Sequence, residues 1–214
     1  MSPNDRYDVS GLSEAQFEPG SDGLVLKNLL SITSSAEMDI AEANALVMAV
    51  DRLVRMYDEE HRFTVNDICE FHRVWLSGIY AWAGEYRQVN VSKGDFMFAA
   101  AGRVPELISQ YERDVLSRCT PCRFSTRDEV VQALAETHVE LVLIHPFRGG
   151  NGRVSRVLST LMALQAGLPL LDFSLIAGEG KEGYFAAVRA GLDRNYRPME
   201  RIFAQVIERS VAES

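Results

Sequence analysis

The segment 145–156, HPFRGGNGRVSR, brings together a histidine, three glycines, an asparagine and three arginines. His145 has the side chain most often used as a general base. Glycines allow a ligand to approach the backbone, and the amides at the start of the following helix carry partial positive charge. Arg153 and Arg156 lie three residues apart on that helix, so both guanidinium groups share one face and suit phosphate. The segment therefore predicts a polyphosphate site beside a histidine base.

Two alternatives explain the segment less well. In the first, 145–156 is a solvated loop, in which His145 caps a helix and the arginines form surface salt bridges. The apolar run before His145 and the two arginines in register favour a binding site over that loop. The second alternative, a Walker loop, requires G-x-x-x-x-G-K-[ST], and GGNGRVSR has neither the lysine nor the hydroxyl residue in place.

Helical patterns surround this segment on both sides. Capping boxes at Ser34/Glu37 and Thr126/Glu129 mark two helix starts. Pro146 biases His145 toward an extended backbone, so the helix from Thr126 should end at His145. Apolar periodicity and stop signals predict helices at 34–57, 64–84, from 105, at 126–145, 154–166, 181–192 and 198–212.

Residues 85–101 break the helical pattern. YRQVNV alternates, SKGD is a turn signal and FMF resumes, which predicts a small β-hairpin. Residues 1–27 show little periodicity and are expected to form an extended or loosely packed arm. The prediction for 28–214 is a single all-α domain with one hairpin.

Composition limits the class of protein. The net charge of −8 disfavours nucleic acid as a partner, no apolar run is long enough to span a membrane, and the N-terminal residues lack a signal-peptide pattern. A cytoplasmic protein is expected. Three cysteines argue against a disulfide framework, and CTPC at 119–122 is more typical of a connecting loop than of half a metal site.

The segment 145–156 closely resembles H-P-F-x-[D/E]-G-N-G-R-x-x-R, the signature of the Fic (Fido) family. The stretch 71–96, FHRVWLSGIYAWAGEYRQVNVSKGDF, resembles the helix and flap that precede the signature, and the likeness covers roughly 35–210. This resemblance implies a Fic-type helical domain whose hairpin, at about 85–101, is a flap. Most members transfer AMP from ATP, with Mg²⁺, to a Ser, Thr or Tyr hydroxyl of a target protein.

The resemblance also implies roles for individual residues. His145 would deprotonate the target hydroxyl, and Phe147 would point into the core and fix the loop. Arg153 would bind the β-phosphate and Arg156 the γ-phosphate, while the flap residues Lys93 and Phe96 would contact the target. The complete expected phosphate-binding set is Arg148, Gly149, Gly150, Asn151, Gly152, Arg153 and Arg156, and Asn151 is counted with His145 as catalytic.

Gly149 departs from the family pattern, because it stands where an acidic residue would hold Mg²⁺. The loss of that carboxylate would put about 10²-fold of rate at stake. Gly149 could cripple the transferase, could mark a different transferred group, or could be replaced in its role by Glu179 or Asp172. No metal ligand is assigned from the sequence.

Glutamates of the first long helix are candidates for inhibition. Many Fic proteins carry [S/T]-x-x-x-E-[G/N], and Glu37 and Glu42 are imperfect matches to it. Either glutamate would pair with Arg156 and block the γ-phosphate. His72 and His138 lack the i, i+4 partner of a metal pair and are expected to be hydrogen-bonded core histidines.

The sequence therefore predicts a protein adenylyltransferase that uses ATP and Mg²⁺. The alternative is a degenerate Fic domain that binds a nucleotide or a partner protein without efficient transfer. A toxin-like domain silenced by a separate antitoxin is the third hypothesis.

Overall fold

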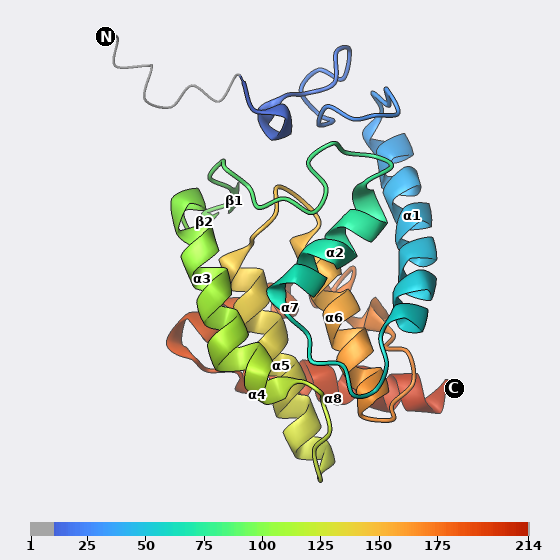
Figure 1. Ribbon diagram of the computed structural model, residues 1–214, viewed down its shortest axis with the longest axis vertical. Coiled ribbons are helices and arrows are strands. Elements are labelled where there is room, and N and C mark those ends of the chain that lie inside the picture. The colour runs from blue at the N-terminus through green and yellow to red at the C-terminus, as the bar shows by residue number, and fades with distance from the viewer. Residues whose placement is uncertain (1–10, 214) are drawn as a thin grey trace.

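The computed structural model describes residues 11–213, and its regular secondary structure there is helical apart from one hairpin and one isolated β-bridge (Figure 1). The α-helices are α1 (Ser35–Met56), α2 (Val65–Leu76), α3 (Val104–Tyr111), α4 (Ser117–Cys119), α5 (Arg127–Ile144), α6 (Asn151–Gln165), α7 (Gly180–Ala190) and α8 (Arg197–Ala212). A π-helical turn, Glu112–Leu116, joins α3 to α4, and 3-10 turns occupy Ser13–Ala15, Ala101–Arg103, Phe173–Ile176 and Gly191–Asp193. The all-α prediction is confirmed. Within 11–213 no helix has the length and apolar character needed to cross a bilayer.

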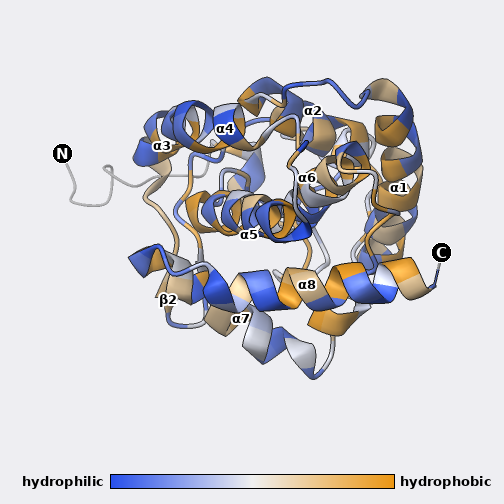
Figure 2. Cartoon of the chain, turned by 90° about the horizontal axis from the view of Figure 1, so that it is seen from below, coloured by the Kyte–Doolittle hydropathy of each residue, from blue (hydrophilic) through white to orange (hydrophobic). Residues whose placement is uncertain are grey.

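Helix α5 forms the centre of the molecule. Its side chains are buried on every side, because α3, α6 and α8 all pack against it (Figure 2). α6 in turn contacts α2, and α2 contacts α1. The α5–α6 connection lies at the same end of the molecule as the hairpin (Figure 1), so the signature residues and the flap are neighbours.

Helix starts follow the capping signals. Thr126 and Glu129 form the predicted reciprocal box at α5, and Thr64 forms another with Asp67 at α2. At α1 only half of the predicted box is present, because the Ser34 side chain accepts from the Glu37 amide without a return bond. The starts of α1, α2 and α5 are therefore set by capping residues that can be recognised in the sequence.

The predicted end of α2 at Gly84 is wrong, since the helix ends at Leu76. The carbonyl of Ile79 accepts a hydrogen bond from Leu29 N at 2.8 Å, so it is not left to continue the helix ladder. The chain then turns, and Gly84 has a positive φ of 86°. Contacts with the N-terminal segment therefore override the helical periodicity at this point.

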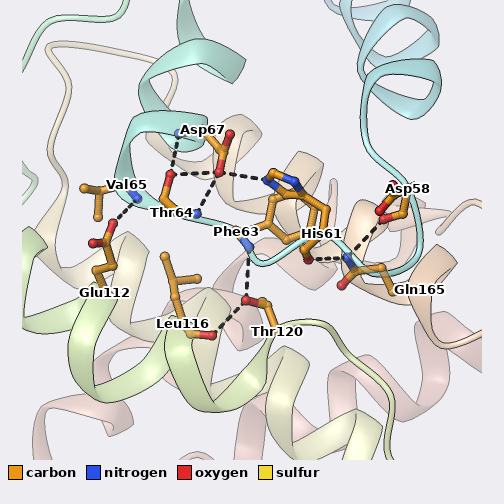
Figure 3. Close-up of polar contacts among 10 residues, drawn as sticks. All are labelled: Asp58, His61, Phe63, Thr64, Val65, Asp67, Glu112, Leu116, Thr120 and Gln165. Atoms are coloured by element: carbon orange, nitrogen blue, oxygen red, sulfur yellow. Dashed lines mark hydrogen bonds and ion pairs between the residues drawn. The ribbon is translucent and has the colours of Figure 1, made fainter.

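The N-terminus of α2 is anchored by long-range hydrogen bonds (Figure 3). Phe63 N donates to Thr120 Oγ1 at 3.1 Å, and Val65 N donates to Glu112 Oε2 at 2.6 Å. Gln165 Nε2 donates to His61 O at 2.8 Å, which ties the α1–α2 connection to the end of α6. These bonds fix the axis of α2, whose other end lies beneath the signature loop.

The hairpin is shorter than predicted. β1 (Ser92–Lys93) pairs antiparallel with β2 (Phe96–Met97), in register Ser92 to Met97 and Lys93 to Phe96. The stretch 86–91 was expected to form a strand and does not, because Arg87 is buried and hydrogen-bonds to carbonyls elsewhere in the chain.

The N-terminal segment is packed rather than loose. Residues 1–10 lie outside the described part of the chain. Beyond them, an isolated bridge pairs Phe17 with Leu26, and Glu14, Ser21 and Val25 are buried. Glu14 Oε1 accepts from Gln88 N at 2.6 Å, so this segment supports the base of the flap. Of the expected extended or loosely packed arm, residues 11–27 therefore make specific contacts with one another and with the flap.

Candidate functional site

The backbone at His145 is left-handed, with φ 54° and ψ 60°, and not extended as Pro146 suggested. α5 does end there, as predicted, because the His145 amide donates to Leu141 O. The strained conformation is held by Arg87: its Nε donates to His145 O at 2.6 Å and its amide donates to Pro146 O at 2.8 Å. Tertiary hydrogen bonds therefore override the preference of a residue that precedes proline.

One hydrogen bond sets the tautomer of the His145 ring. Nδ1 lies 3.1 Å from Val142 O, and because a carbonyl only accepts, Nδ1 carries the proton and Nε2 is left as the basic atom. The ring stacks on Phe98 of the flap, with centroids 3.6 Å apart. Burial lowers the pKa of His145 to about 4, helped by the nearby Arg87 and Lys93. The imidazole is therefore neutral at pH 7.

Arg87 is a site residue that the sequence reasoning missed. Its guanidinium is buried and also donates to Val89 O at 2.9 Å and to Ala99 O at 2.5 Å. It therefore joins both ends of the flap to the backbone of His145. No signal in the sequence indicated this role, because YRQVNV at 86–91 alternates as a β-strand would.

His72 supports the loop from below, and its prediction as a core histidine is confirmed. Nδ1 accepts from Gly84 N at 2.7 Å, so Nε2 carries the proton and donates to Gly149 O at 3.2 Å. The ring stacks on Phe147, with centroids 4.0 Å apart, and Phe147 is buried as expected. Burial lowers the pKa of His72 to about 3, which keeps this donor–acceptor arrangement intact at neutral pH.

Asn151 closes the signature loop on itself. Its Oδ1 accepts from Phe147 N and its Nδ2 donates to Phe147 O, both at 2.8 Å. Gly150 precedes it with φ +76°, and an added Cβ would lie 2.5 Å from the Trp75 ring. The loop therefore requires glycine at 150, and it directs the N-terminus of α6 into the adjacent cavity.

A cavity of about 800 Å³ lies between the flap, the signature loop and α7. It is within the range usual for small-molecule sites. Of the residues predicted to form the site, the cavity lining contains His145, Gly150, Asn151, Gly152, Arg153, Arg156, Lys93 and Phe96. Other lining residues that the sequence reasoning missed are Phe173, Ile176, Lys181, Tyr184, Phe185 and Arg189.

Two predicted phosphate-binding residues are not in the lining. Arg148 points to the N-terminal segment, where its Nε donates to Glu14 O at 2.9 Å. Gly149 faces Trp82, whose ring would lie 3.7 Å from an added Cβ. The structure therefore places these two residues outside the cavity lining, unlike the other five of the expected phosphate-binding set.

Glu42, and not Glu37, reaches the site. Glu42 Oε2 lies 2.7 Å from Arg153 Nη2, and its Oε1 accepts from Tyr80 at 2.9 Å. The expected pairing with Arg156 is wrong, because Glu42 forms its ion pair with Arg153, the first of the two arginines. Glu37 is exposed in the first turn of α1, five residues before Glu42.

The donors around the cavity do not fit a protein-held Mg²⁺, which is usually bound through one or two carboxylates. Position 149 is glycine, and neither Glu179 nor Asp172 lines the cavity. Asp172 instead pairs with Arg209 at 2.7 Å. The only acidic residue in the lining, Asp95, is 89% exposed and pairs with Arg189, and residues 11–213 contain no cluster of three metal-binding side chains.

Comparisons with known proteins assign the family. The model of the Fic/DOC family matches residues 62–163, and the chain belongs to this family. The relatives it resembles include "Protein adenylyltransferase fic-1" of Caenorhabditis briggsae, 30% identical over 72% of this chain, and "Protein adenylyltransferase Fic" of Drosophila melanogaster, 30% identical over 69%. The chain spans only 29% of the length of each.

Solved structures confirm the fold. The Fic domain of Bep8 from Bartonella sp. 1-1C superposes with a TM-score of 0.72 at 22% identity, covering 86% of this chain and 90% of that one. BepC from Bartonella tribocorum, solved with bound AMPPNP, gives 0.68 at 20% identity, covering 85% and 91%. Both are fold neighbours at a distance where the fold alone is shared.

Proposed function

We propose that this domain transfers AMP from ATP to a Ser, Thr or Tyr hydroxyl of a target protein. The observation that carries the proposal is the free Nε2 of His145 at a cavity that also receives the N-terminus of α6 and both arginines. The adenylyltransferase names of the curated relatives support the same reaction.

In this reaction the target hydroxyl oxygen attacks the α-phosphorus of ATP. The bond from that phosphorus to the bridging oxygen breaks, and pyrophosphate leaves in line. His145 Nε2 accepts the hydroxyl proton as the new bond forms. Its Nδ1–H bond to Val142 O holds the ring in the required tautomer and stabilises the imidazolium that results.

Negative charge on the phosphates meets donors from α6. Asn151 and Gly152, in the first turn of α6, line the cavity, so the positive end of the helix dipole lies at its wall. Arg153 and Arg156 approach from the same helix face and suit the β- and γ-phosphates. Preorganised donors of this kind stabilise charge that develops in the transition state.

The rest of the cavity suits a nucleoside and a target segment. Phe173, Ile176 and Phe185 give an apolar wall for the base and ribose. The two-residue strands of the flap leave open edges, to which an extended target segment can add by backbone pairing. Phe96 lies at this edge and also lines the cavity.

The test is transfer of label from ATP tagged on the α-phosphate to protein. We expect labelling by the native chain and none by His145→Ala, with ATP binding retained in the variant. Labelling by His145→Ala would refute the assigned base. A chain that binds no ATP would refute the proposed function itself.

A second candidate is a domain that binds ATP without efficient transfer. Two observations favour it: glycine occupies position 149, and Glu42 already holds Arg153. ATP binding with no label transfer, and transfer restored by Gly149→Glu, would support this second function. The backbone at 149 accepts a side chain, since an added Cβ meets the Trp82 ring at an ordinary 3.7 Å.

A further inference from the structure

The cavity has a strongly cationic lining in an acidic protein. Five of its lining side chains are basic, namely Lys93, Arg153, Arg156, Lys181 and Arg189, whereas the whole chain has a net charge of −8. Two of the five have acidic partners, because Arg153 pairs with Glu42 and Arg189 with Asp95. Within 11–213 the other three form no ion pair. The chain contains only three lysines, and two of them face this cavity.

The three unpaired cations converge from separate elements. Lys93 comes from the flap, Arg156 from α6 and Lys181 from the first turn of α7. Lys93 Nζ lies 4.1 Å from the centre of the Phe185 ring on α7, so the flap amine is held across the cavity by a cation–π contact. Burial lowers the pKa of Lys93, and repulsion from Lys181 and Arg156 lowers it further. Lys181 and Arg156 therefore both lie close enough to Lys93 for their charges to act on it, and an anion bound among the three side chains would offset that repulsion.

Lys93 also lies close to the reacting centre. Lys93, His145 and Arg156 line the same cavity, and the charge of Lys93 contributes to lowering the pKa of His145. A phosphate chain bound in this cavity therefore has His145, Lys93 and Arg156 in its surroundings. From the sequence, Lys93 was expected to contact the target protein, and that expectation did not consider its place beside the phosphate-binding residues.

We propose that Lys93 and Lys181 supply the positive charge on the polyphosphate that a protein-held divalent cation would otherwise supply. The proposal rests on the proposed function, since it takes a nucleoside triphosphate as the ligand. Two ammonium groups carry the same total charge as one divalent ion. The lining has no carboxylate apart from the exposed Asp95, which agrees with a site where lysines, and not a carboxylate-bound metal ion, neutralise the polyphosphate.

The first test is ATP affinity, measured by titration calorimetry in EDTA and in Mg²⁺. We expect ATP to bind in EDTA at least as tightly as with Mg²⁺, because the metal would neutralise charge that the lysines require. Lys93→Ala with Lys181→Ala should weaken binding in EDTA about tenfold or more. Lys27→Ala is the matched control, since Lys27 is exposed and bonds only to Gln16 at 3.0 Å among the described hydrogen bonds.

The results separate this inference from the proposed function. Binding at least tenfold tighter with Mg²⁺, or unchanged binding by the double variant, would overturn the inference and leave the proposed function standing. No ATP binding in either buffer would overturn both. Melting temperatures of the variants, compared with Lys27→Ala, show whether each variant is folded.

A second readout needs no substitution. An amine-reactive acetylating reagent can modify all three lysines, and mass spectrometry reports each one separately. ATP in EDTA should protect Lys93 and Lys181 at least several-fold while leaving Lys27 unchanged. Equal modification of all three with and without bound ATP would overturn the inference.

Discussion

The ion pair between Glu42 and Arg153 makes a quantitative prediction about Glu42→Gln. Arg153 cannot give its full donor set to a phosphate while Glu42 Oε2 lies 2.7 Å away. Glutamine keeps an acceptor for Tyr80, now 2.9 Å from Oε1, and removes the charge that competes for Arg153. The substitution should therefore release one phosphate-binding arginine without emptying a buried position.

The size of the effect follows from the exposure of the pair. A hydrogen bond to a charged group contributes about 1.5–3 kcal/mol when shielded. The side chains here are 33% and 12% exposed, so solvent screening reduces that value to about 1–2 kcal/mol. We expect Glu42→Gln to bind ATP about 5–30-fold more tightly, and to label target protein faster.

Titration calorimetry with ATP is the assay, and Glu37→Gln is the matched control. Glu37 lies on the same helix, is exposed and makes no side-chain contact with the site. Unchanged or weaker ATP binding by Glu42→Gln would refute the competition argument. An equal gain in Glu37→Gln would show that the effect is general electrostatics and not release of Arg153.

Three further predictions concern the base and its supports. Because the pKa of His145 is lowered to about 4, kcat/KM should stay level as the pH falls from 7 to 5. It should decline as the pH falls through about 4, where His145 becomes protonated. A decline centred near pH 6.5 would contradict this. Arg87→Lys should lower kcat about 100-fold with little change in ATP affinity, because one compact ammonium group cannot reach the carbonyls of His145, Val89 and Ala99 together. Separate measurements of kcat and ATP affinity test this, and an equal loss of both would contradict it. Gly150→Ala should destabilise the fold by about 1–3 kcal/mol and lower the melting temperature by roughly 2–12 °C, because Gly150 has a positive φ and an added Cβ would clash with Trp75. Gly149→Ala is the control, and it should melt within about 2 °C of the native chain.

The sequence made the core of the site predictable because that information is local. A histidine after an apolar run, glycines and two arginines three apart lie within twelve residues, 145–156, and His145, Arg153 and Arg156 do line one cavity. The capping boxes at Thr126 and the half-box at Ser34 likewise fixed helix starts from neighbouring residues. Local hydrogen bonds decide these features, so a single chain is enough to read them.

Features that depend on tertiary partners were missed or misassigned. The left-handed backbone of His145 depends on Arg87, 58 residues earlier, and proline statistics alone point the other way. Arg148 was assigned to phosphate because of its position in the signature, yet Glu14 of the N-terminal segment captures it. Lys181 of α7 could not be predicted as a site residue, since no residue close to it in the sequence shows that α7 lines the cavity.

The bonds of Arg87 have a consequence for how such a domain can diversify. One guanidinium holds the carbonyls of Val89 and Ala99, and so closes the segment between them at both ends. Extra residues inserted at the tip, Gly94–Asp95, would lengthen a loop whose ends stay fixed, which costs little additional closure entropy. The length and sequence of the flap tip can therefore change while the backbone geometry of His145, held by the same guanidinium, is kept.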